Sequence, residues 1–523
     1  MLDERTGSQV GLGKRPRHAA ALRTEAAGEV FHTPPGLSRH RRWVALAALT
    51  DVALTGDDLS IDQFEAVARG AARVALAPDA LERIRAANEA IPRVLASGDS
   101  VYGLTTGVGA HKKYRVADAE RDEFNRLLLP SHRVGQGPDA PADVVRGTLL
   151  KLANQLCKGT SGVRPAIAER LVETLNGSSV PRVRMLGTVG ESDLAPMADL
   201  AHEVLGDLQP TGKETLSLIN TSAFATALAA LAVVDCRRLA LAFEAAAALD
   251  LEAFSANLTP LHPRAAEVRP FPGVVAAREN LAGLLAGSGL WQTGARNLQD
   301  PLTFRCAVTV AGALRDALGH VEQMLAVELN ASQENPIYVA AEDRFVSVAN
   351  TDPAGTSAAI DYLRIALAPS VTSACERSQK LLQSVWSGLP LGLIAAEDIP
   401  DDGLSEFGVA TVAIAGEARL LAQPVSYEVV SSSIAEGIED RVTFLPLSGR
   451  RLSEMVSLSE RVCAIELVVA AQALDLRRPE PMGEGTARLH AMVRELVPFT
   501  GTGEIPPQDL EPVCALVRSG RVR

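Results

Sequence analysis

The sequence predicts an all-α protein built around a bundle of long helices. Aromatic residues make up 4% of the 523-residue chain and hydrophobic residues 47%, with alanine and leucine abundant among them. Strands draw on β-branched and aromatic residues, so this composition favours helices. Residues 222–254 contain hardly a helix breaker, which predicts one very long helix. A chain of this length also buries a large core.

Residues 51–221 are predicted to form a loop-rich helical domain. Within residues 59–98 we expect two or three short amphipathic helices, because Ser60 is a favourable N-cap and Phe64 and Val67 follow at helical spacing. The next segments, in order, are a glycine-rich loop at 101–111, helix over 143–176, and a second loop, rich in glycine and proline, at 177–196.

Residues 222–480 are predicted to form the central bundle, and residues 481–523 a C-terminal cap. The long helical segments are expected at 222–254, 305–332, 354–386 and 408–422. Because these helices are apolar on more than one face, they require a bundle and favour contacts between subunits. Polar, glycine-bearing interruptions, where a site would be built, lie at 101–111, 181–196, 211–222, 296–306, 333–353 and 430–441.

The charge of the chain argues against nucleic acid as a partner. The formal net charge is −12, and an acidic surface repels phosphate backbones. Residues 1–50 are the exception in composition, because residues 1–42 are basic and lack the apolar core of a signal peptide. We interpret residues 1–50 as a disordered or non-native tail, with a nucleic-acid arm as the lesser alternative.

Cysteine usage and hydropathy bear on location and metal binding. The six cysteines are scattered and none forms a Cys-x-x-Cys pair, so neither a zinc site nor a disulfide framework is indicated. We expect a cytoplasmic protein without a metal. The longest apolar run, from Ala223 to Val234, is too short to span a bilayer, which requires roughly 20 residues, so no membrane partner is expected.

Eight short segments, each a weak motif alone, follow one another in a recognisable order. They are VYGLTTGVG (101–109), LLLPSHRVGQG (127–137), GTVGESDLAPMA (187–198), GKETLSLIN (212–220), NLQDPLTFRC (297–306), SQENPIY (332–338), SGLP (387–390) and EGIEDRV (436–442). Together they resemble the aromatic amino acid ammonia-lyase family, and within it the histidine ammonia-lyases, over roughly residues 55–510.

The resemblance implies an all-α homotetramer whose active sites are assembled from loops of three subunits. It also implies a reaction, β-elimination, in which an amine leaves Cα and a proton leaves Cβ to give an arylacrylate. The substrate is then a small, amino-acid-like molecule.

Several residues match functional positions of the family. Tyr102 matches the general base at Cβ, and its pKa, ordinarily near 10, would have to be lowered for that role. Asn220 and Gln299 match residues that line the pocket. Arg305 matches the residue that binds the substrate carboxylate, for which a guanidinium is a natural bidentate partner. The alternatives are an ordinary tyrosine at a helix end and a structural ion pair.

Three further residues bear on substrate choice. Ser131 and His132 with Glu439 match the positions that select the side chain in histidine-specific members. A carboxylate that faces an imidazole N–H forms a charge-assisted hydrogen bond, so the substrate is expected to be imidazole-like. A solvated helix charge is the alternative for Glu439. Asn335 also matches the family pattern, and for this residue a structural role is at least as well supported as a functional one.

Three departures from the pattern concern the chemistry. Glu191, Ser192 and Asp193 stand, one residue short, where the family has Ala-Ser-Gly-Asp, whose Ala-Ser-Gly cyclises to a methylidene-imidazolone group. Leu302 replaces a second catalytic tyrosine, and Thr351 replaces a phenylalanine that packs near the group. Cyclisation needs a backbone that folds tightly, which glycine allows and aspartate resists. We therefore expect no prosthetic group and no other cofactor.

All three departures concern the amine end of the site. The electrophile improves a poor leaving group, ammonia, whereas a quaternary trimethylammonium leaves as neutral trimethylamine without proton transfer. Ergothionase, a lyase of this family that acts on a trimethylated thio-histidine, follows this logic. Glu191, Ser192 and Asp193 would then face the leaving group, where carboxylates stabilise a cation. The alternative is that both carboxylates are solvated loop charges.

Two other functions fit the same residues. One keeps the scaffold but changes the reaction, to an aminomutase or a cyclising enzyme of secondary metabolism. The other is a catalytically silent family member that binds a small molecule or pairs with an active paralogue.

Overall fold

The protein was analysed as a computed structural model, which describes residues 51–522 except 294, 397–400 and 428–433. The tail predicted at residues 1–50 therefore lies outside the described residues. All described residues belong to one compact unit, and the divisions predicted after residues 221 and 480 fall inside it.

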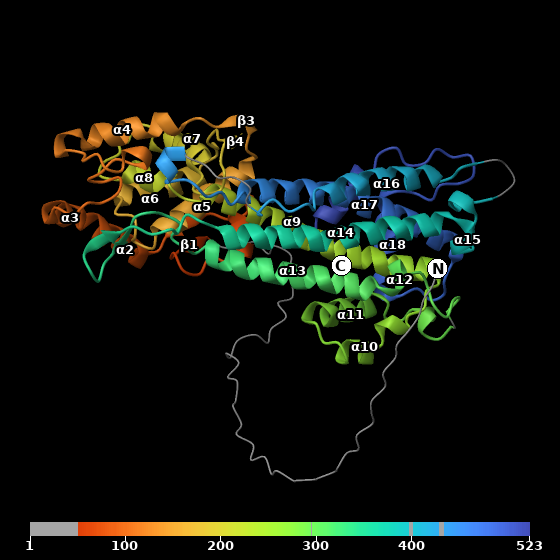
Figure 1. Cartoon of the computed structure of the whole chain (residues 1–523). Coiled ribbons are helices and arrows are strands. Elements are labelled where there is room, and N and C mark those ends of the chain that lie inside the picture. The colour runs from red at the N-terminus through yellow and green to blue at the C-terminus, as the bar shows by residue number, and fades with distance from the viewer. Residues whose placement is uncertain (1–50, 294, 397–400, 428–433, 523) are drawn as a thin grey trace, which may run out of the picture. The chain divides into compact units, whose positions relative to one another are not determined.

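The bundle is formed by five helices that run side by side (Figure 1). They are α9 (Ala223–Phe254), α13 (Ala307–Glu328), α14 (Ala354–Leu382), α16 (Ser405–Leu420) and α17 (Leu445–Arg477). Helix α9 packs against α5 (Ala142–Leu156), α13 and α17 and is buried on nearly all sides, as its apolar composition requires. This arrangement confirms the predicted all-α fold.

Helix α17 was missed by the sequence analysis, although it is the longest helix in the described chain. Its first half mixes apolar and polar residues and contains Pro446 and Gly449, which hide the helical pattern. Pro446 lies at the start of the helix, where a missing N–H costs little. Gly449 packs against Leu228 and Ala229 of α9, so its lack of a side chain serves helix contact.

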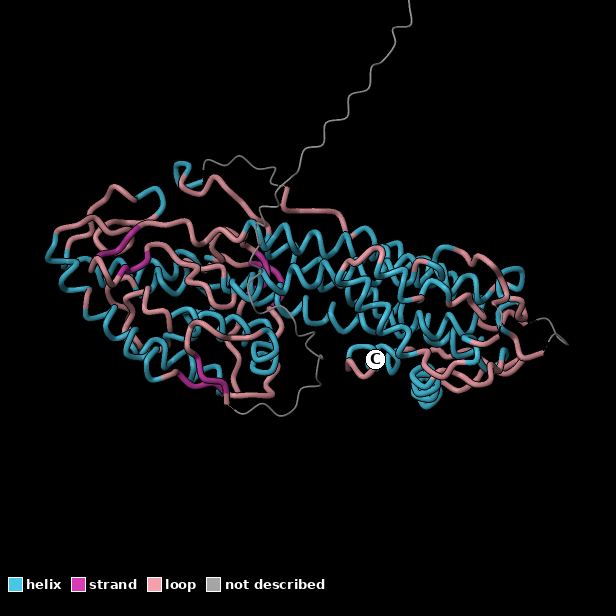
Figure 2. The backbone as a smooth tube through the Cα atoms, turned by 90° about the horizontal axis from the view of Figure 1, so that it is seen from below, coloured by secondary structure: helices cyan, strands magenta, loops and turns pink. Residues whose placement is uncertain are grey.

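The loop-rich part lies at one end of the bundle and contains the six short strands of the described residues (Figure 2). Its helices are α1 (Ile61–Ala68), α2 (Pro78–Glu89), α3 (Ile91–Ser97), α4 (Arg121–His132), α5 (Ala142–Leu156), α6 (Pro165–Asn176), α7 (Leu194–Leu205) and α8 (Glu214–Ile219). The strands pair as β1 (Val52–Leu54) with β2 (Val74–Leu76), β3 (Gln136–Asp139) with β4 (Arg184–Leu186), and β5 (Ile337–Val339) with β6 (Arg344–Val346). The first pair is parallel and the others are antiparallel.

Local sequence signals explain several boundaries in this part. Ser60 caps α1 as predicted, because its hydroxyl accepts a hydrogen bond from the Gln63 backbone amide at 3.2 Å. The Ser60 backbone amide in turn donates to the Gln63 side-chain oxygen at 2.9 Å. The helix predicted over 143–176 is two helices, α5 and α6. Gly159 and Gly162, both in the left-handed region, break it.

The remaining helices pack along the bundle or lie at its far end. They are α10 (Pro263–Glu267), α11 (Pro272–Leu284), α12 (Leu302–Arg305), α15 (Ser384–Ser387), α18 (Glu484–Leu496) and α19 (Glu511–Arg518). Within the described chain, one stretch, Glu214–Phe254, is long and apolar enough to cross a membrane, longer than the predicted apolar run. Its most apolar window is 94% buried inside the protein, as in a core helix of a bundle.

Candidate active site

A cavity of about 860 Å³ lies in the loop-rich part of the chain. Its wall comes from the loop that follows α3, from α4, from the loop before α7, from the end of α8, and from the segments around residues 348–351 and 435–439. Apart from α4, these segments belong to the polar interruptions in which the sequence analysis expected a site, whereas the interruption at 296–306 does not contribute to the cavity. No lysine or arginine lines the cavity among the described residues.

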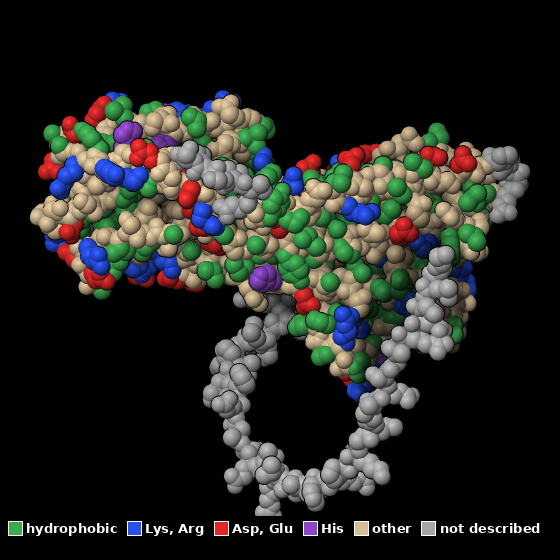
Figure 3. Space-filling view, in the orientation of Figure 1, with side chains coloured by type: hydrophobic (Ala, Val, Ile, Leu, Met, Phe, Trp, Pro, Cys, Tyr) green, Lys and Arg blue, Asp and Glu red, His purple; other side chains and the backbone are tan. Residues whose placement is uncertain are grey.

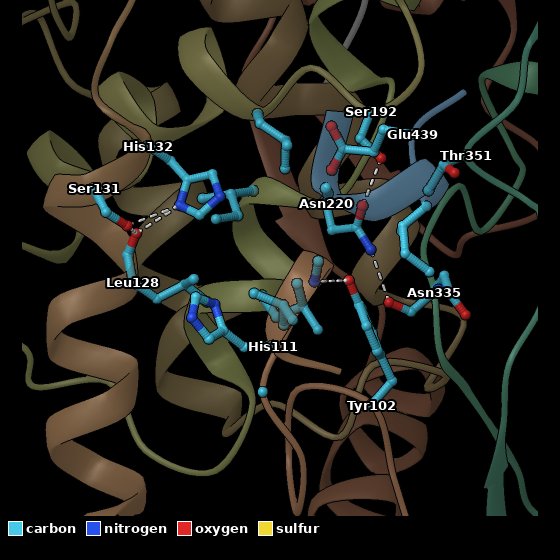
Figure 4. Close-up of a pocket in the computed structure, with 18 of the residues that line it drawn as sticks. Tyr102, His111, Leu128, Ser131, His132, Ser192, Asn220, Asn335, Thr351 and Glu439 are labelled. Carbon is cyan, nitrogen blue, oxygen red and sulfur yellow. Dashed lines mark hydrogen bonds between the residues drawn. The ribbon is translucent and has the colours of Figure 1, made fainter. Parts of the chain in front are cut away.

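The cavity brings together most of the predicted site residues (Figure 4). Tyr102, His132, Glu191, Ser192, Asn220, Thr351 and Glu439 all line it, and so do Ser131 and Asn335. Gln299, Leu302, Arg305 and Asp193 do not line it.

Tyr102 sits on a tightly folded glycine-rich loop. Gly103 has a φ of 71°, and a side chain there would collide with Leu216, so only glycine suits the turn. The Tyr102 hydroxyl accepts a hydrogen bond from the Gly109 amide at 2.8 Å. Burial raises the pKa of Tyr102, the Glu439 carboxylate raises it further, and the Gly109 N–H opposes them. Within one chain the pKa thus moves opposite to the direction that a base requires.

His132 and Glu439 lie on opposite sides of the cavity in Figure 4, although both were predicted to bind one ring. His132 Nδ1 lies 2.8 Å from the Leu128 carbonyl oxygen, so Nδ1 carries the proton and donates to it. Ser131 donates to the same carbonyl at 2.8 Å. Glu439 is drawn on the side of Ser192 and Asn220, and its charge acts on Tyr102.

The loop at residues 187–194 forms a hydrogen-bonded wall of the cavity. Ser192 has a φ of 57°, in the region that favours glycine. Its hydroxyl donates to Asn220 Oδ1 at 2.5 Å, and Asn220 Nδ2 donates to the Asn335 carbonyl at 2.8 Å. The Thr351 hydroxyl donates to Glu191 Oε1 at 3.1 Å.

Asp193 does not face the cavity, contrary to the expectation that it meets a substrate cation. Its side chain is fully buried and accepts from the Ala225 amide at 2.7 Å and from the Thr188 hydroxyl at 2.9 Å. Burial nevertheless raises its pKa to about 7, because desolvation outweighs these donors. Asp193 therefore anchors the loop to the first turn of α9, where unpaired backbone N–H groups require acceptors.

Gln299, Leu302 and Arg305 lie at the other end of α9. Phe304 of α12 stacks on Phe254, the last residue of α9, with ring centroids 4.1 Å apart. Asn220 of the cavity lies just before the first residue of α9, whose 32 residues span about 48 Å. All three side chains are exposed, and Arg305 donates a hydrogen bond to Gln299. One chain therefore does not bring them to the cavity.

The sequence profile of the aromatic amino acid lyase family matches residues 59–209 and 204–495. The chain belongs to the aromatic amino acid lyase family. A histidine ammonia-lyase of Anaeromyxobacter sp. strain K is 34% identical over 502 residues, which cover 89% of this chain and 98% of the relative. A histidine ammonia-lyase of Symbiobacterium thermophilum is also 34% identical, over 493 residues, with 89% and 96% covered. The protein is thus a carbon–nitrogen lyase by family.

Solved structures agree with this assignment. The ergothioneine-degrading ergothionase of Treponema denticola is 27% identical and superimposes with a TM-score of 0.85, over 90% of this chain and 99% of that one. A tyrosine aminomutase of Streptomyces globisporus gives 26% identity and a TM-score of 0.84, over 90% and 97%. Histidine ammonia-lyase of Trypanosoma cruzi gives 28% and 0.82, over 90% and 94%. The long-helix fold is therefore that of the family.

The lyase does contain an Ala-Ser-Gly tripeptide, Ala96-Ser97-Gly98, which the sequence analysis overlooked. Ser97 is the last residue of α3, and Gly98 ends that helix with a φ of 78°. The Ser97 hydroxyl donates to the Val94 carbonyl at 2.9 Å. None of the three residues lines the cavity, so this tripeptide acts as a helix end.

His111 is a cavity residue that the sequence analysis of this lyase missed. It lies two residues beyond Gly109 on the Tyr102 loop and lines the cavity in Figure 4. The segment after VYGLTTGVG carried no family motif, so the only signal was its position on the same loop. Among the described residues no group of three or more histidine, cysteine or acidic residues is arranged to hold a metal.

Proposed function

We propose that this lyase eliminates an amine from a histidine-like or aromatic α-amino acid, or from its N-methylated betaine, without a methylidene-imidazolone group. One observation carries the proposal. The loop at residues 187–194 is occupied by Glu191, Ser192 and Asp193, and the Asp193 amide, the nitrogen two residues beyond Glu191, donates to the Thr221 carbonyl at 2.9 Å. An amide held in this bond is turned away from a cyclisation with the preceding residues.

Without an electrophile, the leaving group itself has to be good. In the proposed reaction the Tyr102 phenolate takes the proton from Cβ, the C–H electron pair forms the Cα=Cβ bond, and the C–N bond breaks. A trimethylammonium group then departs as neutral trimethylamine. It has no N–H proton, so it does not consume the base.

The proposed substrate would also lower the pKa of Tyr102, the proposed base. A cation within a few ångströms stabilises the phenolate and lowers the pKa of Tyr102, against the effects of burial and of Glu439. A quaternary ammonium substrate brings this charge into a cavity that no lysine or arginine of the described chain lines. The resemblance to ergothionase of Treponema denticola, an ergothioneine-degrading enzyme, supports the same substrate class.

The carboxylate of the substrate would be held by Arg305 of a neighbouring subunit. Arg305 and Gln299 are exposed at the far end of α9, where the cavity of their own chain is out of reach. Apolar side chains are exposed over the bundle in Figure 3. Among the exposed apolar residues of the bundle helices are Tyr362 and Ile365 of α14 and Val409 of α16. An apolar face exposed on one chain would be buried between copies, which supports the homotetramer that the family resemblance implies.

A second candidate function is an aminomutase, because the tyrosine aminomutase of Streptomyces globisporus is as similar in structure as the ammonia-lyases. In that case the amine would be added back at Cβ rather than released. The two functions differ in product, a β-amino acid against an arylacrylate.

The experiment is to incubate the purified protein with histidine, N,N-dimethylhistidine and histidine betaine, and to follow arylacrylate absorbance with mass detection of the amine. We expect trimethylamine and arylacrylate from the betaine, with kcat/KM for histidine lower by about a hundredfold or more. Comparable turnover of histidine would contradict the leaving-group argument. A β-amino acid product would establish the aminomutase, and no product from any substrate would favour the silent member.

A further inference from the structure

Two of the segments that depart from the family pattern contact each other in the structure. Glu191 and Ser192 belong to the loop before α7, whereas Thr351 lies about 160 positions later, just before α14. The Thr351 hydroxyl donates to Glu191 Oε1 at 3.1 Å, and the Ser192 amide lies 3.5 Å from the Thr351 carbonyl oxygen. All three residues line the cavity. These two departures therefore form one connected surface, whereas the third, Leu302, lies at the other end of α9.

Thr351 is the fixed member of this surface. The residue is 8% exposed, and its carbonyl oxygen also accepts a hydrogen bond from the Ser222 hydroxyl at 2.7 Å. Ser222 is the N-cap residue of α9, the most buried helix of the bundle. Thr351 is thus tied to the rigid bundle, while Glu191 lies on a loop. A β-branched side chain also has few rotamers, so the direction of its hydroxyl is well defined.

The hydroxyl protons of Ser192 and Thr351 are donated to neighbouring residues of the cavity wall. The Ser192 hydroxyl donates to Asn220 Oδ1, and the Thr351 hydroxyl donates to Glu191. The hydroxyl oxygens and the carboxylate therefore offer acceptors to a ligand. A surface of acceptors with a carboxylate suits a cation and disfavours an anion.

We propose that Thr351 is a positioning residue that orients the Glu191 carboxylate, so that Glu191, Ser192 and Thr351 together form the subsite for the quaternary ammonium group of a betaine substrate. This inference rests on the proposed function and adds to it the residues that hold the leaving group. The phenylalanine that the family pattern has at position 351 offers no such hydroxyl.

The test compares Thr351→Val, which removes the hydroxyl at nearly constant volume, with Thr351→Ser, which keeps it. We expect Thr351→Val to lower kcat/KM for histidine betaine about 10- to 100-fold, mainly through KM, as for a lost hydrogen bond to a charged group. Thr351→Ser should stay within about threefold of the wild type. In a Glu191→Gln background, Thr351→Val should cost no more than about a further twofold, because the two side chains act as a pair.

Thr174→Val is the matched control. Thr174 lies on α6 outside the cavity, and its hydroxyl donates only to the Arg170 carbonyl. This variant should keep wild-type kinetics. Equal losses in Thr351→Val and Thr351→Ser would overturn the positioning role, and so would full additivity with Glu191→Gln.

A binding measurement separates this inference from the proposed function. Calorimetric titration of the full-length protein with histidine betaine needs no turnover, and Thr351→Val should weaken binding about 10- to 100-fold while Thr351→Ser retains it. If the wild type binds the betaine without eliminating the amine, the proposed reaction fails and this ratio still decides the role of Thr351. If the wild type does not bind the betaine, or binds histidine equally well, the quaternary ammonium subsite is wrong.

Discussion

The two ends of α9 carry two halves of the predicted site, and they differ in what they offer a substrate. The N-terminal end holds a cavity with Tyr102, Glu191 and Glu439, and no lysine or arginine of the described chain lines it. The C-terminal end exposes Arg305 and Gln299. One end suits a cation and a base, and the other suits a carboxylate. An α-amino acid or a betaine carries both charges, so in the proposed homotetramer the two ends that bind it would have to come from different chains.

The largest expected effect is at the cavity end. Tyr102→Phe removes the proposed base and should lower kcat for the betaine by about 10² to 10⁴. The melting temperature should change little, because the hydroxyl has only the Gly109 amide as a partner among the described bonds. Steady-state kinetics and thermal melting check this result.

Tyr427→Phe is the control for that variant, because Tyr427 is exposed in the segment after α16 and does not line the cavity. It should keep full activity. If Tyr102→Phe kept the wild-type kcat, Tyr102 would not be the base of the reaction.

Asp193 is buried behind the cavity and anchors its loop to α9, so the prediction for it concerns stability. Its pKa is raised to about 7 in the fold, whereas an unfolded aspartate releases its proton near pH 4. Between these values the native state holds a proton that the unfolded state has lost, so stability falls as pH rises through this window and levels off above it. Asp193→Asn does not titrate. The free energy of unfolding of the wild type relative to Asp193→Asn should thus fall by about 2 kcal/mol between pH 5 and pH 7.

Urea denaturation at several pH values measures this difference. Asp99→Asn, at an exposed aspartate, should give a difference that is flat over the same range. A flat curve for Asp193→Asn would mean that the buried carboxyl is ionised throughout and is stabilised by a partner other than its present donors.

The third prediction tests whether the two ends meet between subunits. Arg305→Gln alone should lower kcat/KM by roughly 10²-fold, because a bidentate, charge-assisted contact is lost. Co-expression of Tyr102→Phe with Arg305→Gln should restore activity, to about one quarter of the wild-type sites if the two residues come from different subunits at random.

Arg344→Gln, which changes an exposed surface ion pair, serves as the control. When it is co-expressed with Tyr102→Phe, the activity should be no higher than that of Arg344→Gln alone. Absence of complementation by Arg305→Gln would place both residues in one chain's site or remove Arg305 from it.

Sequence patterns predicted the fold class and most of the cavity. The apolar stretch 222–254 is α9, and the motif residues Tyr102, His132, Asn220 and Glu439 meet in one cavity, because loops at one end of a bundle necessarily converge. Three features were beyond reach. The polar first half of α17 hides its periodicity, the burial of Asp193 depends on the distant first turn of α9, and motif order does not reveal the length of helix that separates Arg305 from Tyr102.

The central claim is that the enzyme eliminates an amine while the loop at residues 187–194 stays uncyclised. Trypsin cleavage after Arg184 and Lys213 yields the peptide that spans this loop, and cleavage after Arg93 and Lys112 yields the one that contains Ala96-Ser97-Gly98. Both should be measured by mass spectrometry on the preparation that turns over histidine betaine. We predict that both peptides have the masses encoded by the sequence. A mass lower by about 36 Da, the loss of two waters, in either peptide would contradict the account.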